Sequence, residues 1–126
     1  ATKFLEVEVI GAKTKEDARL ISKSVITSNL TKCAFFGADA NWGRIIAATG
    51  YSGAEVEEEK IDIYVGDAKV CENGGGIMED ETLVNQELKK KEVRIKIDLK
   101  RGNESVKVWG CDLTQGYIEI NADYRS

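Results

Sequence analysis

The 126-residue sequence predicts an α+β fold, a mixed or antiparallel sheet covered by about three helices. Two segments, residues 4–10 and 93–99, alternate apolar with charged residues, which is the period of a half-buried strand. Helical spacings and short hairpin turns lie between these segments in no regular order, and this irregular mixture favours the α+β class. Residues 1–126 contain no repeat and no linker, so a single domain is expected.

The first third of the chain predicts a strand, a helix and a second strand. Leu5, Val7 and Val9 would share the buried side of the first strand. Thr14-Lys15-Glu16-Asp17 has the spacing of a capping box and predicts a helix to about residue 27. Residues 31–36 predict the second strand.

A second helix is predicted from an i, i+3, i+4, i+7 pattern formed by Trp42, Ile45, Ile46 and Thr49. Gly50 or Gly53 could end this helix. The acidic residues 54–60 then predict a loop.

The remaining sequence predicts hairpins around one more helix. Gly66-Asp67 would join two short strands, and residues 79–90 would form a helix with Leu83, Val84 and Leu88 inward. After the strand at 93–99, the turn Arg101-Gly102-Asn103 leads into further strands over residues 106–113 and 117–122.

Composition excludes several classes of function. The net charge of −4, with acidic and basic residues interleaved, gives no electrostatic basis for binding nucleic acid or an anionic membrane surface. No run is apolar and long enough to span a membrane, and no signal-peptide pattern opens the chain. Histidine is absent, which excludes a Ser-His-Asp triad, a Cys-His dyad and a histidine-ligated zinc site within this chain. Three widely spaced cysteines favour reduced thiols and a cytoplasmic location.

The most distinctive segment is Gly37-Ala38-Asp39-Ala40-Asn41-Trp42-Gly43-Arg44. A turn between a predicted strand and a helix can direct backbone N–H groups at an anionic ligand. Asp39 or Asn41 could cap the helix, and Arg44 in its first turn opposes the helix dipole, as if it met an anion. One hypothesis is therefore an anion site at Asp39, Asn41 and Arg44. The other, which residue types alone favour, is that they shape the turn while Trp42 fills the core.

Two other clusters have simpler explanations. Residues 72–76, Glu-Asn-Gly-Gly-Gly, lack the pattern of a phosphate-binding loop and predict a flexible hairpin loop. Four glutamates could bind a divalent cation, but neighbouring carboxylates usually form a solvated face; they are Glu55, Glu57, Glu58 and Glu59. No metal site is therefore expected.

The C-terminal segment, residues 117–126, is predicted to begin as a strand with Asn121 on its polar side. It ends in Tyr-Arg-Ser, whereas exposed termini are usually small, polar and frayed. Such a tail is better explained if it packs into a neighbouring site, although a docked strand end is the alternative.

Five segments, in the same order, resemble the ornithine acetyltransferase/N-acetylglutamate synthase (ArgJ) family. They are residues 1–9, 37–44, 47–53 (Ala-Ala-Thr-Gly-Tyr-Ser-Gly), 110–114 (Gly-Cys-Asp-Leu-Thr) and 121–126. Ala40 stands where the family commonly has Pro, and Thr31-Lys32-Cys33 replaces a usual Val-Lys-Thr; both look like neutral packing changes. The chain resembles the C-terminal part of the family's β chain.

The resemblance implies an activity in arginine biosynthesis. In this family a precursor cleaves itself into an α and a β chain, and the new N-terminal Thr of the β chain takes the acetyl group of N2-acetylornithine and passes it to glutamate. Acetyl-CoA could also serve as acetyl donor, and no cofactor is expected. The nucleophile would lie upstream of this chain, which alone should be inactive. The expected partners are the upstream α chain and the N-terminal part of the β chain, in a heteromer that oligomerises further.

The resemblance carries two substrate-binding residues onto this chain, and no catalytic ones. Asn121 and Ser126 match the family's substrate-contacting Asn and its terminal Thr or Ser. An amide and a hydroxyl suit an amino-acid head group, which offers both donors and acceptors.

Two other functions are open from the sequence. Removal of Ala1 would expose Thr2 as the N-terminal nucleophile of a small hydrolase, although an ordinary strand follows Thr2 directly. The chain could also be a stand-alone amino-acid-binding or assembly module.

Overall fold

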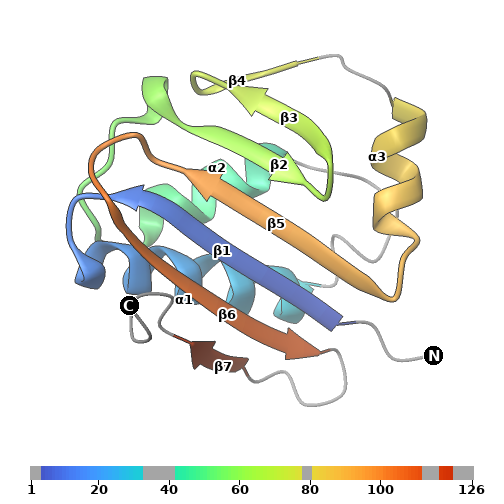
Figure 1. Cartoon of the computed structure of the whole chain (residues 1–126), viewed down its shortest axis with the longest axis horizontal. Coiled ribbons are helices and arrows are strands. Elements are labelled where there is room, and N and C mark those ends of the chain that lie inside the picture. The colour runs from blue at the N-terminus through green and yellow to red at the C-terminus, as the bar shows by residue number, and fades with distance from the viewer. Residues whose placement is uncertain (1–3, 33–41, 78–80, 112–116, 121–126) are drawn as a thin grey trace.

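The computed structural model describes residues 4–32, 42–77, 81–111 and 117–120, which form one mixed sheet with helices against it (Figure 1). The elements in chain order are β1 (Phe4–Ala12), α1 (Lys15–Lys32), α2 (Trp42–Tyr51), the 3-10 helix η2 (Glu58–Lys60), β2 (Asp62–Val65), β3 (Ala68–Glu72), β4 (Gly75–Gly76), α3 (Glu81–Leu88), β5 (Glu92–Asp98), β6 (Glu104–Cys111) and β7 (Tyr117–Ile120).

The strands follow the order β4-β3-β2-β5-β1-β6-β7 in the sheet. β1 lies inside the sheet and pairs in parallel with β5, with Phe4 opposite Glu92 and Ile10 opposite Asp98. The other neighbouring pairs are antiparallel. The predicted α+β class with a mixed sheet is therefore confirmed.

The alternation of the central strands separates an apolar face from a charged one. Leu5, Val7 and Val9 of β1 are fully buried, and the apolar positions of the neighbouring strands are also buried, namely Val93, Ile95, Ile97, Val106 and Val108. α1 and α2 lie against this face (Figure 1), and each large side chain buried there contributes about 1.5–3 kcal/mol. On the opposite face Trp109 Nε1 donates a hydrogen bond of 2.9 Å to Glu6.

Helix α1 begins where the capping pattern predicts but ends later. Thr14 Oγ1 accepts a hydrogen bond of 3.0 Å from the Asp17 N–H. The helix continues to Lys32, so the strand predicted over residues 31–36 is wrong at residues 31 and 32; the rest of that prediction lies outside the described residues. Val25 and Ile26 pack into the core and stabilise the helix. Each further helical residue then adds a hydrogen bond, and together these contributions outweigh the strand preference of Thr31.

Helix α2 confirms the helix that the spacing predicted, while the side chain of Trp42 lies outside the described part, so its place in the core stays a prediction. Ile45 and Thr49 are buried, and Thr49 Oγ1 donates to the Ile45 carbonyl at 2.9 Å. Ser24 Oγ of α1 donates to the Ala48 carbonyl at 2.7 Å and so joins the two helices. Gly50 lies inside the helix, and Gly53 follows it with φ +89°. The acidic segment beyond contains η2 as well as loop.

The β2–β3 hairpin turns at Gly66, which has φ +58°. Glu87 of α3 packs against this turn so closely that a Cβ on Gly66 would overlap its carboxylate. Glu87 is only 5% exposed, and it accepts a hydrogen bond of 2.9 Å from Lys90 Nζ. The helix predicted over residues 79–90 is wrong at residues 89 and 90, where α3 has already ended, and residues 79 and 80 lie outside the described residues. The burial of Glu87 was not predicted.

Candidate functional site

Most of the predicted site residues lie outside the described part of the chain. This holds for Asp39, Asn41, Asn121 and Ser126. Arg44 belongs to the first turn of α2, and its side chain is also outside the described part. The structure therefore neither brings these residues together nor separates them, and both predicted sites stay predictions.

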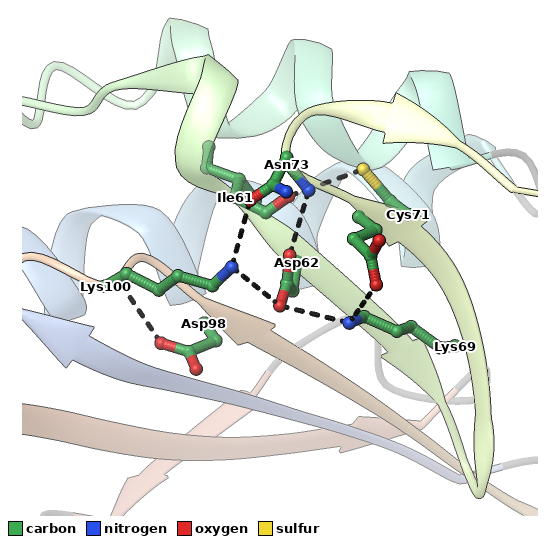
Figure 2. Close-up of polar contacts among 8 residues, drawn as sticks. Ile61, Asp62, Lys69, Cys71, Asn73, Asp98 and Lys100 are labelled. Atoms are coloured by element: carbon green, nitrogen blue, oxygen red, sulfur yellow. Dashed lines mark hydrogen bonds and ion pairs between the residues drawn. The ribbon is translucent and has the colours of Figure 1, made fainter.

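The described residues contain a polar cluster around the buried Asp62, at one end of the sheet (Figure 2). Asp62 is 4% exposed and lies between the fully buried Ile61 and Ile63. Its Oδ1 accepts a hydrogen bond of 2.9 Å from the Asn73 N–H. Its Oδ2 lies 3.0 Å from Lys100 Nζ and 3.4 Å from Lys69 Nζ. We call Asp62, Lys69, Asn73 and Lys100 the Asp62 cluster.

The Asp62 cluster joins two turns that require left-handed backbone. Asn73 (φ +50°) and Gly74 (φ +80°) are the central residues of the β3–β4 hairpin, as a type I′ turn requires. Lys100, in the β5–β6 turn, has φ +56°. Its Nζ also donates to Asn73 Oδ1 at 3.1 Å, so one ammonium group holds both the carboxylate and the hairpin amide.

The electrostatics of the Asp62 cluster favour a structural role. Burial alone would raise the pKa of Asp62, but the Asn73 N–H and the two lysines outweigh it and hold that pKa below its usual range. A hydrogen bond to Glu72, with Asp62 nearby, raises the pKa of Lys69. At neutral pH the cluster therefore holds the Asp62 carboxylate between two lysines, and the shifts of Asp62 and Lys69 both favour their charged forms.

Cys71, beside the cluster, is a poor nucleophile. It is fully buried, and burial raises the pKa of its thiol. Its Sγ donates a weak hydrogen bond of 3.6 Å to the Ile61 carbonyl. Reactive cysteines need the opposite, a lowered pKa and access to solvent.

Arg101 connects the same end of the sheet to the acidic segment that precedes β2. Its Nη1 lies 2.5 Å from Glu57 Oε1 and its Nη2 lies 2.9 Å from Glu55 Oε2, so these glutamates hold an arginine. The backbone N–H groups of Arg101 and Gly102 donate to the Gly11 carbonyl at 2.7 and 2.9 Å. Within the described ranges, no group of three His, Cys, Asp or Glu side chains could hold a metal ion.

A surface groove of about 550 Å³ runs between α1 and the end of α2. Its lining residues are Leu20, Lys23, Ser24, Thr27, Ser28, Tyr51 and Ser52. Two of its hydroxyls are already engaged, since Ser24 donates to Ala48 O and Ser52 donates to Thr49 O. The groove therefore offers little fixed polar chemistry for a specific ligand. No helix in the described part of the chain is long and apolar enough to cross a membrane.

Sequence reasoning missed the Asp62 cluster. One available signal was the Asn-Gly pair between two strand patterns, which predicts a tight I′ hairpin. No sequence pattern indicated that Asp62 would meet Lys100, because that contact depends on the pairing of β2 with β5.

Comparisons with known proteins agree with one another. The model of the ArgJ family matches residues 1–126. The arginine biosynthesis bifunctional protein ArgJ of Caldanaerobacter subterraneus subsp. tengcongensis is 52% identical over 130 residues, which is all of this chain and 32% of that protein. A glutamate N-acetyltransferase of Methanosarcina acetivorans is 46% identical over 129 residues, 98% of this chain and 33% of that protein. The chain thus spans about a third of these relatives. The crystal structure of ArgJ from Bacillus halodurans superposes with a TM-score of 0.81 at 43% identity, covering 89% of this chain and 53% of that one.

Proposed function

Because the chain belongs to the ArgJ family, we propose that it is part of a glutamate N-acetyltransferase of arginine biosynthesis. The observation that carries this proposal is the match of the family model to residues 1–126. Identity of 46% to a protein named glutamate N-acetyltransferase supports it. The fold alone would not suffice, since one fold hosts many functions.

The proposed reaction transfers an acetyl group from N2-acetylornithine to glutamate through an acetyl-threonine on the upstream part of the protein. The threonine hydroxyl attacks the acetyl carbonyl and ornithine leaves; the amine of glutamate then attacks the ester and frees the hydroxyl. Acetyl-CoA is a second candidate donor. The partners in this proposal are the α chain and the N-terminal part of the β chain, assembled in the cytoplasm.

This chain would supply binding residues and no nucleophile. Cys71 is buried and its thiol has a raised pKa, and Lys69 and Lys100 are paired with Asp62. None of these three side chains is therefore an activated nucleophile. Asn121 and Ser126 are the proposed substrate-binding residues. In support, β7 pairs with β6 at the edge of the sheet and ends at Ile120, the residue directly before Asn121.

A chimera tests the proposal. This chain would replace the matching third of Caldanaerobacter ArgJ, and acetyl transfer from N2-acetylornithine to glutamate would be measured beside the isolated chain. We expect transfer by the chimera and none by the isolated chain. A chimera that folds and cleaves itself but transfers no acetyl would contradict the proposal. So would turnover by the isolated chain with acetyl on one of its own residues.

A further inference from the structure

Asn73-Gly74 is a dipeptide with its own chemistry. In an Asn-Gly pair the glycine nitrogen can attack the side-chain carbonyl carbon of the asparagine, because glycine has no side chain to obstruct the approach. A five-membered succinimide forms and ammonia leaves. Water then opens the ring to aspartate or isoaspartate, so the amide is hydrolysed overall with no oxidant or reductant.

We propose that Asn73 is a latent deamidation site that the Asp62 cluster keeps unreactive in the folded chain. The attacking group would be the Gly74 nitrogen, whose N–H donates to the Ile61 carbonyl at 2.8 Å. The carbonyl under attack carries Asn73 Oδ1, which accepts a hydrogen bond of 3.1 Å from Lys100 Nζ. Cyclisation must break the first contact to free the nitrogen and the second to turn the amide toward it.

The first contact is anchored in buried structure, which makes its opening infrequent, whereas the second joins two exposed side chains. Ile61 is fully buried, and Asp62, which holds the Asn73 N–H, is 4% exposed. Gly74 lies so close to the Glu58 carbonyl that even a Cβ would overlap it. The reaction therefore requires the hairpin to separate locally from β2 and η2, and its rate scales with the population of that opened state.

The product would not fit the site that the amide occupies. An aspartate at position 73 adds a second carboxylate next to Asp62, and Lys100 would then serve both. Isoaspartate also adds a methylene to the backbone of a two-residue turn whose central residues both need positive φ. One opening event that leads to reaction would thus weaken the β3–β4 hairpin permanently.

The ammonium group of Lys100 also withdraws electrons from the carbonyl carbon through Oδ1, and this effect favours attack rather than preventing it. Removing Lys100 shows which of the two effects is larger. If Lys100 holds the amide in place, removing it accelerates deamidation; if it activates the amide, removing it slows deamidation.

The test follows deamidation of the full 126-residue chain in mildly alkaline buffer by peptide mapping and mass spectrometry. Lys100→Met is the test variant. Lys69→Met is the matched control, because Lys69 contacts the same Asp62 oxygen but not the Asn73 amide in the described contacts. We expect Lys100→Met to deamidate about 3- to 10-fold faster than the parent, since losing a solvent-exposed hydrogen bond shifts an opening equilibrium by about that factor. Lys69→Met should show a smaller increase.

Two results would overturn the proposal. One is a rate in folded Lys100→Met equal to or below that of the parent. The other is a parent chain that deamidates as fast when folded as when unfolded in urea. If Lys100→Met does not fold, sub-denaturing urea on the parent replaces it: the rate should rise with urea well before global unfolding, and a flat rate there contradicts gating by local opening.

Discussion

Replacing Gly66 by alanine should destabilise the chain more than the same replacement at Gly53. Both glycines have positive φ, +58° and +89°, where an L-residue costs about 1–2 kcal/mol. At Gly53 nothing lies within 4 Å of the added Cβ, so only this cost applies. At Gly66 the Cβ displaces the buried carboxylate of Glu87 and disturbs its 2.9 Å hydrogen bond from Lys90. Displacing a buried polar group adds about 1–3 kcal/mol, so the total at Gly66 is about 2–5 kcal/mol.

Urea unfolding followed by tryptophan fluorescence measures both losses, provided that the slope with urea is unchanged. A Gly66→Ala/Glu87→Ala double variant removes the overlap but keeps the backbone cost, so alanine at position 66 should cost less in the Glu87→Ala background than in the parent. Equal losses for Gly66→Ala and Gly53→Ala would refute the reasoning, because they would mean that Glu87 does not pack on the turn.

Three further predictions concern charged and polar groups. The folded pKa of Asp62 lies below its usual value, so this carboxylate stabilises the fold above about pH 4, and the contribution is lost as the pH falls through the folded pKa. In urea unfolding, Asp62→Asn should be less stable than the parent at neutral pH, and its free energy of unfolding should fall less on acidification. A variant whose stability depends on pH as the parent's does would contradict this. Arg101→Met should lower the free energy of unfolding by about 1–3 kcal/mol. In a double-mutant cycle with Glu57→Gln, the coupling energy should be at least about 0.5 kcal/mol, whereas additive losses of stability would mean that the ion pair contributes nothing. In an assembled enzyme, Asn121→Ala or deletion of Ser126 should lower kcat/KM about threefold to a hundredfold for both substrates, and unchanged kinetics would leave the tail as a docked strand end.

The sequence predicts the strands well because one face of the sheet is buried. Leu5, Val7 and Val9 alternate with charged residues only because their face meets the helices, and the same holds at Val93 and Ile95. The prediction failed at residues 31 and 32, where local strand preference competes with a helix already stabilised by its packing. A local sequence pattern does not show which of the two, the helix or the strand, is the more stable.

The polar interior was much less predictable. Asp62 and Glu87 look like ordinary solvated carboxylates in sequence, yet both are at most 5% exposed. Their burial depends on partners from other elements, such as Lys100 for Asp62, and on the turn at Gly66 for Glu87. The proposed substrate residues Asn121 and Ser126 came from family resemblance, and the alternating pattern predicted only a strand with Asn121 on its polar side.

The position of β1 inside the sheet has a consequence for how the chain folds. Among the described strands, β1 precedes all the others in the sequence, whereas its partners β5 and β6 come late. The parallel pairing of residue 4 with residue 92 closes a loop of most of the domain, and such non-local contacts make folding slow. Until β5 and β6 have been synthesised, β1 lacks both of its partners, and unpaired strand edges are the surfaces on which strands of other chains add. Pairing of β1 therefore has to wait for β5 and β6, and a product truncated before β5 would leave β1 without partners and open to aggregation.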